Sequence, residues 1–322
     1  MNRAILADSS PSVKLIFSAL VVVGTWLIFQ LLAIVSGMLF FIVEFEEVIE
    51  MMDRMHDPES VKYLKYVQAV TSIGLFIVSS FIIALALDRE IFNFLLLNRV
   101  PGKRSLLLVG IFIVTILPFS NLLTELNRSL SLPDSLSPVQ SFFEEKESQM
   151  EGIMRSFLNV KGMWALLANL LIIAVIPAFG EELLFRGIFQ RLFTLLTKNS
   201  HAGIIIAALA FSALHMQFLS FLPRFVLGIL FGYFVFWSGS LWPAILAHFI
   251  NNSLAVIYYY FLARSTRLIT RQDYSGMTEI DLENVGAPGH AQYLGVLSIF
   301  ITVLLVYLIY RSMRAKDCFN RY

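Results

Sequence analysis

The sequence has little charge and almost no cysteine. Of its 322 residues, 15% are Asp, Glu, Lys or Arg, the formal net charge is +1, and one residue is a cysteine. This single cysteine, Cys318, cannot form an internal disulfide, which excludes the disulfide-stapled secreted domains. A net charge close to zero attracts no polyanion, so nucleic acid is not an expected partner. The scarcity of charge also excludes an intrinsically disordered chain.

Apolar residues, in contrast, are in excess. Hydrophobic side chains make up 57% of the chain and the mean hydropathy is +0.75, whereas a soluble protein is roughly half apolar and about a quarter charged. A soluble protein of this length could not bury so much apolar surface, which predicts an integral membrane protein surrounded by the lipid bilayer. We therefore expect an all-α, polytopic bundle of about eight transmembrane helices. The apolar segments of suitable length cover about 15–43, 67–87, 105–123, 164–185 or beyond, 202–221, 225–237, 241–261 and 293–310.

The connections between the predicted spans differ in charge. If the N-terminus is cytoplasmic, the inward-facing connections and both termini hold more Lys and Arg than Asp and Glu, and the outward-facing connections are rich in Glu. By the positive-inside rule, this pattern predicts that both termini are cytoplasmic. No eukaryotic targeting or retention signal is recognisable, so the bacterial inner membrane is the expected location.

Composition also divides the chain into parts. Proline and glycine residues predict that two long polar segments are irregular loops. The expected parts are a cytoplasmic N-terminal tail (1–14), a three-helix membrane region (15–123), a polar loop (124–162), a membrane core with the candidate catalytic residues (163–262), an extramembrane loop (263–291), and a last helix with a basic tail (292–322).

The fourth predicted span contains three ionisable residues, Glu181, Glu182 and Arg186. An ionisable side chain in the middle of a membrane costs roughly 2.5–3.5 kcal/mol on insertion scales, so such residues are candidates for function. Glu182 and Arg186 are four positions apart with the acid first, which favours an ion pair on one helix face. Adjacent residues of a helix point in different directions, so Glu181 is left as the carboxylate that is free for chemistry.

The fifth and seventh predicted spans supply polar groups of a complementary kind. Phe211 and His215 share one helix face, and so do His248 and Asn252. Hydrolysis within a membrane needs an activated water and donors for the oxyanion that develops. We expect Glu181 and His215 to hold and deprotonate the water, and His248 and Asn252 to donate to the oxyanion.

The residues leave alternatives open. A metal such as zinc accepts a Glu/His/His ligand set, which would here be Glu181, His215 and His248. There is no HExxH motif and the ligands would come from three separate helices, so the residues leave both a metal and a metal-free water open, and the metal-free water is favoured only together with the family resemblance described below. The ion pair and each histidine, taken singly, also have purely structural interpretations. Gly228 and Gly232 form a GxxxG motif that predicts close helix packing. The joint presence of the polar groups in three spans favours a functional site.

These residues form three motifs that together carry a family resemblance. EExxxR stands at Glu181–Arg186, FxxxH at Phe211–His215, and HxxxN at His248–Asn252. Their order and their setting in apolar helices resemble the CPBP family of intramembrane proteases, also called the Abi or type II CAAX prenyl protease family. The resemblance covers about residues 163–260.

The resemblance implies an all-helical bundle around a polar cavity and hydrolysis of a peptide bond within the membrane. Glu181 would correspond to the activating acid of the family, His215 to its partner at the water, and His248 and Asn252 to the oxyanion-stabilising pair. Glu182, Arg186 and Phe211 complete the motifs as supporting residues. Members are commonly labelled metalloproteases, and a metal-free mechanism is also proposed for them.

Two functions from different classes follow. The first is an intramembrane endopeptidase that acts on a membrane-associated peptide or protein. The second is a non-catalytic immunity or scaffold protein of the same family. A transporter, in which buried Glu and His relay protons, is disfavoured because no inverted repeat is recognisable. The endopeptidase requires the fourth helix to continue through 187–196, since Glu181 otherwise lies too far from His215.

Overall fold

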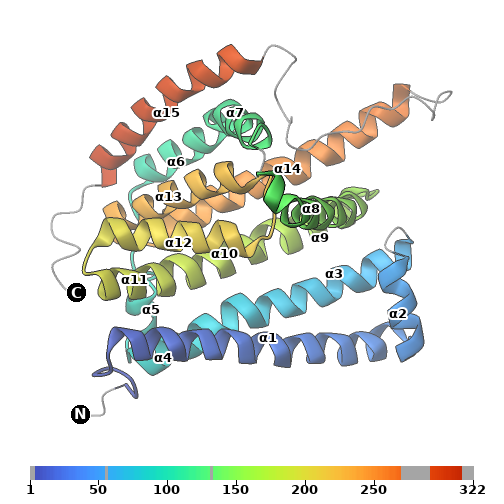
Figure 1. Cartoon of the computed structure of the whole chain (residues 1–322), viewed down its shortest axis with the longest axis horizontal. Coiled ribbons are helices and arrows are strands. Elements are labelled where there is room, and N and C mark those ends of the chain that lie inside the picture. Colours follow the sequence, from blue (N-terminus) through green and yellow to red (C-terminus); the bar gives the residue numbers. More distant parts are fainter. Residues whose placement is uncertain (1–3, 55–56, 131–132, 270–290, 314–322) are drawn as a thin grey trace.

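The computed structural model describes residues 4–54, 57–130, 133–269 and 291–313. Every secondary-structure element in these ranges is a helix, which confirms the all-α prediction (Figure 1). The first part of the chain forms α1 (Pro11–Phe41), α2 (Phe45–Asp53), α3 (Pro58–Ser72), the π-helix η1 (Ile73–Val78), α4 (Ser79–Leu87), α5 (Ile91–Phe94), α6 (Lys103–Thr115), α7 (Leu117–Arg128), the 3-10 helix η2 (Asp134–Leu136) and α8 (Ser137–Leu158). The second part forms α9 (Met163–Asn169), the π-helix η3 (Leu170–Val175), α10 (Ile176–Glu182), the π-helix η4 (Leu183–Phe189), α11 (Gln190–Thr197), α12 (Ser200–Leu214), α13 (Phe221–Ser238), α14 (Trp242–Ile269) and α15 (Ala291–Met313).

Five helical stretches are long and apolar enough to cross a membrane, which identifies an integral membrane protein. A sixth is added if α6 and α7, which are bent by 44° relative to each other, form one span. The two remaining predicted spans overlap α12, which is apolar but has 15 residues, and α14, which contains a histidine and two asparagines. Helices thus lie in each of the eight predicted segments, but eight transmembrane spans stay a prediction. The five stretches are Pro11–Phe41, Pro58–Leu87, Met163–Thr197, Phe221–Ser238 and Tyr293–Met313.

The core lies between two outer groups of helices. Figure 1 shows α1 along α3 and α4 on one side, α6, α7 and α15 on the other, and α10 to α14 between them. Large apolar side chains fill the centre, where the rings of Phe112 and Phe234 meet edge to face with their centroids 5.3 Å apart. In contrast, α1 turns its large side chains outward, as a lipid-facing helix does, and buries small residues, which are Ser18, Thr25, Ala33 and Gly37.

The stretch Met163–Thr197 is a continuous helix of 35 residues. This confirms that the helix extends through 187–196, as the endopeptidase hypothesis required. The π-helices η3 and η4 flank α10 on both sides. π-Helical turns within α-helices are frequent at functional sites. The acid pair at the end of α10 therefore lies where the helix departs from regular geometry.

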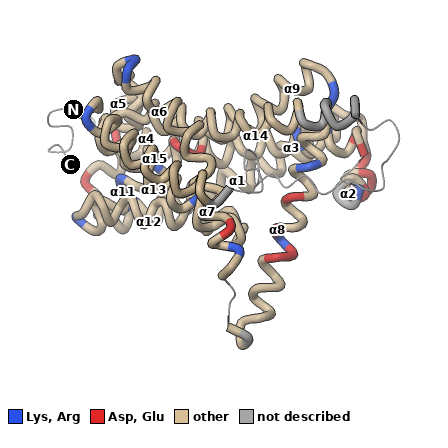
Figure 2. Tube along the Cα trace, turned by 90° about the horizontal axis from the view of Figure 1, so that it is seen from above, with Lys and Arg blue, Asp and Glu red and all other residues tan. Residues whose placement is uncertain are grey.

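The irregular conformation predicted over 124–162 is wrong for most of this segment. α7 continues to Arg128, and α8 covers Ser137–Leu158. Pro138 lies in the first turn of α8, where its missing N–H breaks no helical hydrogen bond, so this proline begins a helix instead of marking a loop. α8 extends away from the other helices and carries charged residues along its length (Figure 2). Most of the second predicted loop, 270–290, lies outside the described residues.

Candidate active site

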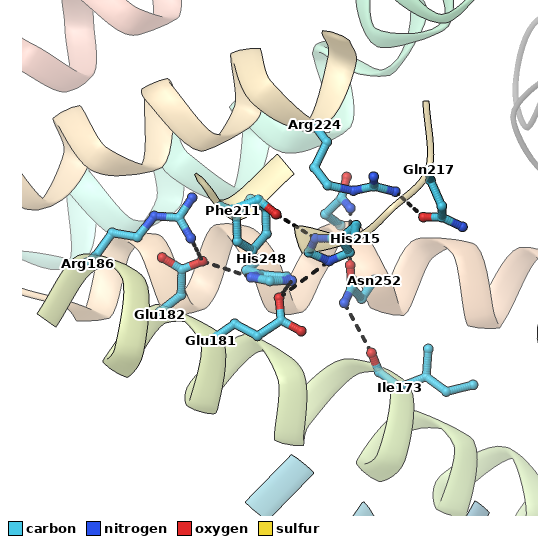
Figure 3. A network of polar contacts seen from close by, with 11 residues as sticks. Ile173, Glu181, Glu182, Arg186, Phe211, His215, Gln217, Arg224, His248 and Asn252 are labelled. Carbon is cyan, nitrogen blue, oxygen red and sulfur yellow. Dashed lines mark hydrogen bonds and ion pairs between the residues drawn. The ribbon is translucent and has the colours of Figure 1, made fainter. Parts of the chain in front are cut away.

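Three helices bring the predicted catalytic residues together (Figure 3). Glu181 is on α10, His215 directly follows α12, and His248 is on α14. The Oε2 atom of Glu181 lies 3.9 Å from Nε2 of His215 and 3.9 Å from Nε2 of His248. One carboxylate oxygen and two imidazole nitrogens, which are far apart in the sequence, thus surround a common point.

The hydrogen bonds of the two histidines determine which ring nitrogen carries the proton. Nδ1 of His215 lies 2.7 Å from the backbone oxygen of Phe211, and Nδ1 of His248 lies 2.8 Å from Oε1 of Glu182. A carbonyl or carboxylate oxygen only accepts, so Nδ1 is the donor in both rings. In a neutral imidazole, Nε2 is then an acceptor. The Nε2 atom of each ring therefore faces Oε2 of Glu181, as an acceptor in a neutral ring and as a donor in a protonated ring.

Glu182 connects the predicted ion pair to His248, one of the two candidate catalytic histidines. Its Oε1 atom accepts from Nη1 of Arg186 at 2.7 Å and from Nδ1 of His248 at 2.8 Å. The i,i+4 spacing predicted the pair with Arg186. It gave no signal for the contact with His248, because that residue comes from another helix. Glu182 therefore orients His248 in addition to neutralising Arg186.

Phe211 contacts several members of the site at once. The guanidinium of Arg186 lies 4.5 Å from the centroid of its ring, a cation–π geometry. The same ring meets the His215 ring edge to face, with the centroids 4.8 Å apart. The supporting role predicted for Phe211 is thus carried by its ring, which packs the site, and by its carbonyl oxygen, which orients His215.

The GxxxG motif packs α13 against α12, and its backbone accepts hydrogen bonds from two side chains of the long helix. Arg186 Nη2 donates to the carbonyl oxygen of Gly228 at 3.3 Å, and Gln190 Nε2 donates to that of Gly232 at 3.2 Å. A Cβ atom at Gly232 would lie 2.8 Å from Oε1 of Gln190 and 2.8 Å from Cγ2 of Ile204. The close packing predicted from the motif is confirmed, and Gln190 is a buried polar partner that the sequence did not single out.

Asn252 bonds to the long helix just before the acid pair. Its Nδ2 atom donates to the carbonyl oxygen of Ile173 at 3.1 Å, and its Oδ1 atom accepts from Nδ2 of Asn251 at 3.2 Å. Pro177, four residues after Ile173, has no N–H to donate to that carbonyl, so the asparagine supplies a donor there. The amide group of Asn252 has a second Nδ2 hydrogen, and its predicted oxyanion role stays a prediction.

The polar network has a closed end and an open end. The closed end is Glu182 and Arg186, whose side chains are 0% and 1% exposed. The open end is Glu181, His215 and Asn252, where the side chain of His215 is 32% exposed. His248 joins the two ends. The network is therefore most exposed on the side of His215.

Two polar residues beside the open end were not singled out from the sequence. Arg224 Nη2 donates to Oε1 of Gln217 at 2.5 Å, and both side chains lie near His215 in Figure 3. Gln217 is in the connection between α12 and α13, and Arg224 is in the first turns of α13. No spacing pattern marked either residue, because neither is at the centre of an apolar span.

The zinc alternative stays a prediction. Within the described ranges, no group of three or more His, Cys, Asp or Glu side chains is arranged to hold a metal ion. The carboxylate oxygen of Glu181 lies 3.9 Å from Nε2 of His215 and 3.9 Å from Nε2 of His248. The reaction steps proposed below use the groups of this chain alone.

Comparison with known proteins adds a family relationship. Residues 163–254 match the family model described as type II CAAX prenyl endopeptidase Rce1-like. Over 90 residues the chain is 33% identical to the uncharacterized protein YpbD of Bacillus subtilis (strain 168), and this match covers 27% of the present chain and 43% of that protein. The chain thus spans less than half the length of this relative. No solved structure matches the chain.

The family match confirms the resemblance that the three motifs predicted. The matched range includes every candidate site residue. The family is one of proteases, which supports a peptidase activity in general.

Proposed function

We propose that this protein is an intramembrane endopeptidase, which hydrolyses a peptide bond in a membrane-associated peptide or protein. One observation carries the proposal: Oε2 of Glu181 and Nε2 of both His215 and His248 surround a common point at the open end of a buried polar network. The match of residues 163–254 to the CAAX prenyl endopeptidase family supports the same reaction class.

A water molecule fits the chemistry of this point. The separation of 3.9 Å is too long for a direct hydrogen bond. Oε2 of Glu181 is buried and has no hydrogen-bond partner within the described part of the chain. A buried acceptor without a donor costs about 1–3 kcal/mol, so a small donor is favoured there. A water that donates one hydrogen to Glu181 and the other to His215 keeps a lone pair for the substrate.

The groups of the site then account for hydrolysis. Glu181 takes a proton from the water, and the water oxygen bonds to the carbonyl carbon of the substrate. The electron pair of the C=O bond moves to the oxygen, and the resulting oxyanion accepts hydrogen bonds from the second Nδ2 hydrogen of Asn252 and from His248. Glu181 passes its proton to the amide nitrogen, the C–N bond breaks, and a carboxylic acid and an amine are formed.

The closed end makes His248 able to act as a donor. Nε2 of His248 carries a hydrogen only when both ring nitrogens are protonated, because Nδ1 already donates to Glu182. Oε1 of Glu182, 2.8 Å from Nδ1 of His248, is the adjacent anionic partner in that form. The positive charge of Arg186 compensates the negative charge of Glu182, which lowers the free-energy cost of burying both side chains.

The test compares wild-type protein with Glu181→Gln and His215→Ala variants. We expect both variants to fold and to lose about 10²- to 10⁴-fold in the rate of peptide cleavage, the range for loss of general acid–base catalysis. Substrates are found as membrane peptides that accumulate uncut in Glu181→Gln cells. Glu144→Gln, the same change at an exposed position of α8, is the matched control and retains the wild-type rate.

Two outcomes would contradict the proposal. Full cleavage by either variant would exclude the mechanism, and a biological phenotype that survives Glu181→Gln would favour the non-catalytic immunity or scaffold function. A chelator distinguishes the metal-free water from a metal-bound one. Loss of activity that is reversed by zinc would show that a metal takes part.

A further inference from the structure

The backbone at His215 receives little support from its own helix. His215 follows the last residue of α12, and its N–H bonds to the carbonyl of Ser212 at a long 3.4 Å. The next residue, Met216, has φ +55°, in the left-handed region that is unfavourable for residues with a side chain. The His215 ring bonds to the carbonyl oxygen of Phe211, but the backbone that carries the ring is continuous with the connection over 216–220, defined here as the His215 loop.

Two polar side chains, one on α7 and one on α8, form hydrogen bonds with the His215 loop. Glu147 on α8 is 2% exposed, and it accepts from the backbone N–H of Leu219 at 2.8 Å and from Oγ of Ser220 at 2.9 Å. Asn127 at the end of α7 is 3% exposed. It donates to the carbonyl of Phe218 at 2.7 Å and accepts from the N–H of Leu222 at 2.8 Å, just beyond the loop.

The helix that carries Glu147 is itself anchored at its far end. Lys65 of α3 donates from Nζ to the carbonyl oxygen of Phe157 and to Oδ1 of Asn169, both at 2.7 Å. Phe157 lies in the last turn of α8. A cation at the C-terminal end of a helix also interacts favourably with the helix dipole. Because the C-terminal end of α8 is hydrogen-bonded to α3, and Lys65 also bonds to α9, the helix holds Glu147 in a defined position next to the His215 loop.

We infer that Glu147 and Asn127 are positioning residues for His215. The inference rests on the proposed function, since it assigns the segment before residue 163 to the catalytic unit. Neither residue is in the family-matching range 163–254, so this support comes from outside the part of the chain that matches the family. A shift of about 1 Å in a catalytic group can cost about 10²-fold in rate, which is the scale of effect that a loosened loop would have.

Three variants separate hydrogen bonding from packing at Glu147. Glu147→Leu keeps most of the side-chain volume and removes both acceptors. Glu147→Gln keeps an acceptor for the N–H of Leu219 and a donor for the hydroxyl of Ser220. We expect the Leu variant to lower kcat by about 10- to 100-fold with KM within about twofold of wild type, and the Gln variant to remain close to wild type. Glu145→Leu, at an exposed position of the same helix, is the matched control.

Asn127 provides an independent check through the same loop. Asn127→Ala should lower kcat in the same direction. The double variant with Glu147→Leu should lose less than the product of the two single losses, because residues that act through one element are not additive. If the loss of kcat in the double variant equals the product of the two single losses, the two residues act separately, which would contradict their action through one loop.

Amide hydrogen exchange measures the loop without relying on catalysis. Glu147→Leu should speed exchange over 216–222 and leave 181–189 unchanged, and Glu147→Gln should change neither. If the wild-type protein cleaves no peptide, the proposed function fails, yet the exchange result still decides whether Glu147 holds the loop. Wild-type kcat in Glu147→Leu, or equal losses in the Leu and Gln variants, would overturn the inference.

If Glu147→Leu does not fold, Ser220→Ala serves as a substitute because it removes one of the two hydrogen bonds to Glu147. This variant should produce a smaller loss of kcat, and an unchanged kcat in Ser220→Ala would overturn the inference.

Discussion

The closed and open ends of the polar network differ in how their charges are satisfied. At the closed end, Glu182 accepts from Arg186 at 2.7 Å and from His248 at 2.8 Å. At the open end, Glu181 is 3.9 Å from both histidine rings. A buried charge is tolerable only with close partners, whereas acceptors that are held apart leave room for a reagent. The comparison shows that the closed end orients His248, and it supports our proposal that the open end carries the chemistry.

The largest expected effect on stability comes from removing the cation of the closed end. Arg186→Met leaves the carboxylate of Glu182 buried without its ion-pair partner. Breaking a buried pair in this way costs about 3–5 kcal/mol. We expect a clear decrease in the midpoint of thermal unfolding in detergent micelles, and unchanged stability in this variant would contradict the role given to the closed end.

A double variant sharpens the same comparison. Arg186→Met combined with Glu182→Leu removes both charges, and a buried pair replaced by apolar residues is often neutral for stability. The double variant should therefore regain much of the lost stability. Its peptide cleavage should remain low, because Nδ1 of His248 has lost its acceptor. Wild-type cleavage by the double variant would show that Glu182 does not orient His248.

Substitution at the open end should give the opposite result. Asn252→Ala removes a proposed oxyanion donor, a loss that typically lowers kcat by about 10²- to 10³-fold. The free energy of unfolding should decrease by only about 1 kcal/mol, because the hydrogen bond to the carbonyl oxygen of Ile173 is lost. Steady-state kinetics and thermal unfolding measure the two effects on the same sample.

The neighbouring asparagine offers a matched control. Asn251→Ala deletes the same kind of side chain from the adjacent position of α14, which points in a different direction. It should lower kcat by much less than Asn252→Ala does, because it removes only the hydrogen bond from Nδ2 of Asn251 to Oδ1 of Asn252 and leaves both Nδ2 hydrogens of Asn252 in place. Equal losses of kcat in the two variants would show that Asn252 has no special role at the reacting carbonyl.

The smallest expected effect is on packing behind the closed end. Gly232→Ala places a methyl group 2.8 Å from Gln190 and Ile204, and overpacking of this kind costs about 1–3 kcal/mol. Gly24→Ala is the matched change on α1, where no described atom lies within 4 Å of the new methyl group. Thermal unfolding should show a lower midpoint for Gly232→Ala than for Gly24→Ala. A larger loss in Gly24→Ala would contradict this account of the core.

Several predictions from the sequence concerned local features, and these agree with the structure. The ion pair of Glu182 and Arg186 follows from helical spacing, and the continuation of the fourth helix through 187–196 was required by the endopeptidase hypothesis. The prediction for 124–162 was wrong because a proline inside a polar segment can begin a helix as well as mark a loop. The contact between Glu182 and His248 was missed because a residue with an evident local partner gave no reason to look for another.

The sequence by itself determined the apolar helices, the three motifs and the kinds of chemical group that they carry. These depend on composition and on spacing within one turn of a helix, which are local properties. Tertiary structure alone decided that His248 bonds to Glu182, that Asn252 supplies a donor to the carbonyl of Ile173, and that Glu147 holds the loop after His215. Each of these contacts joins segments whose separation depends on how the helices pack together, and no pattern along a single helix records that packing.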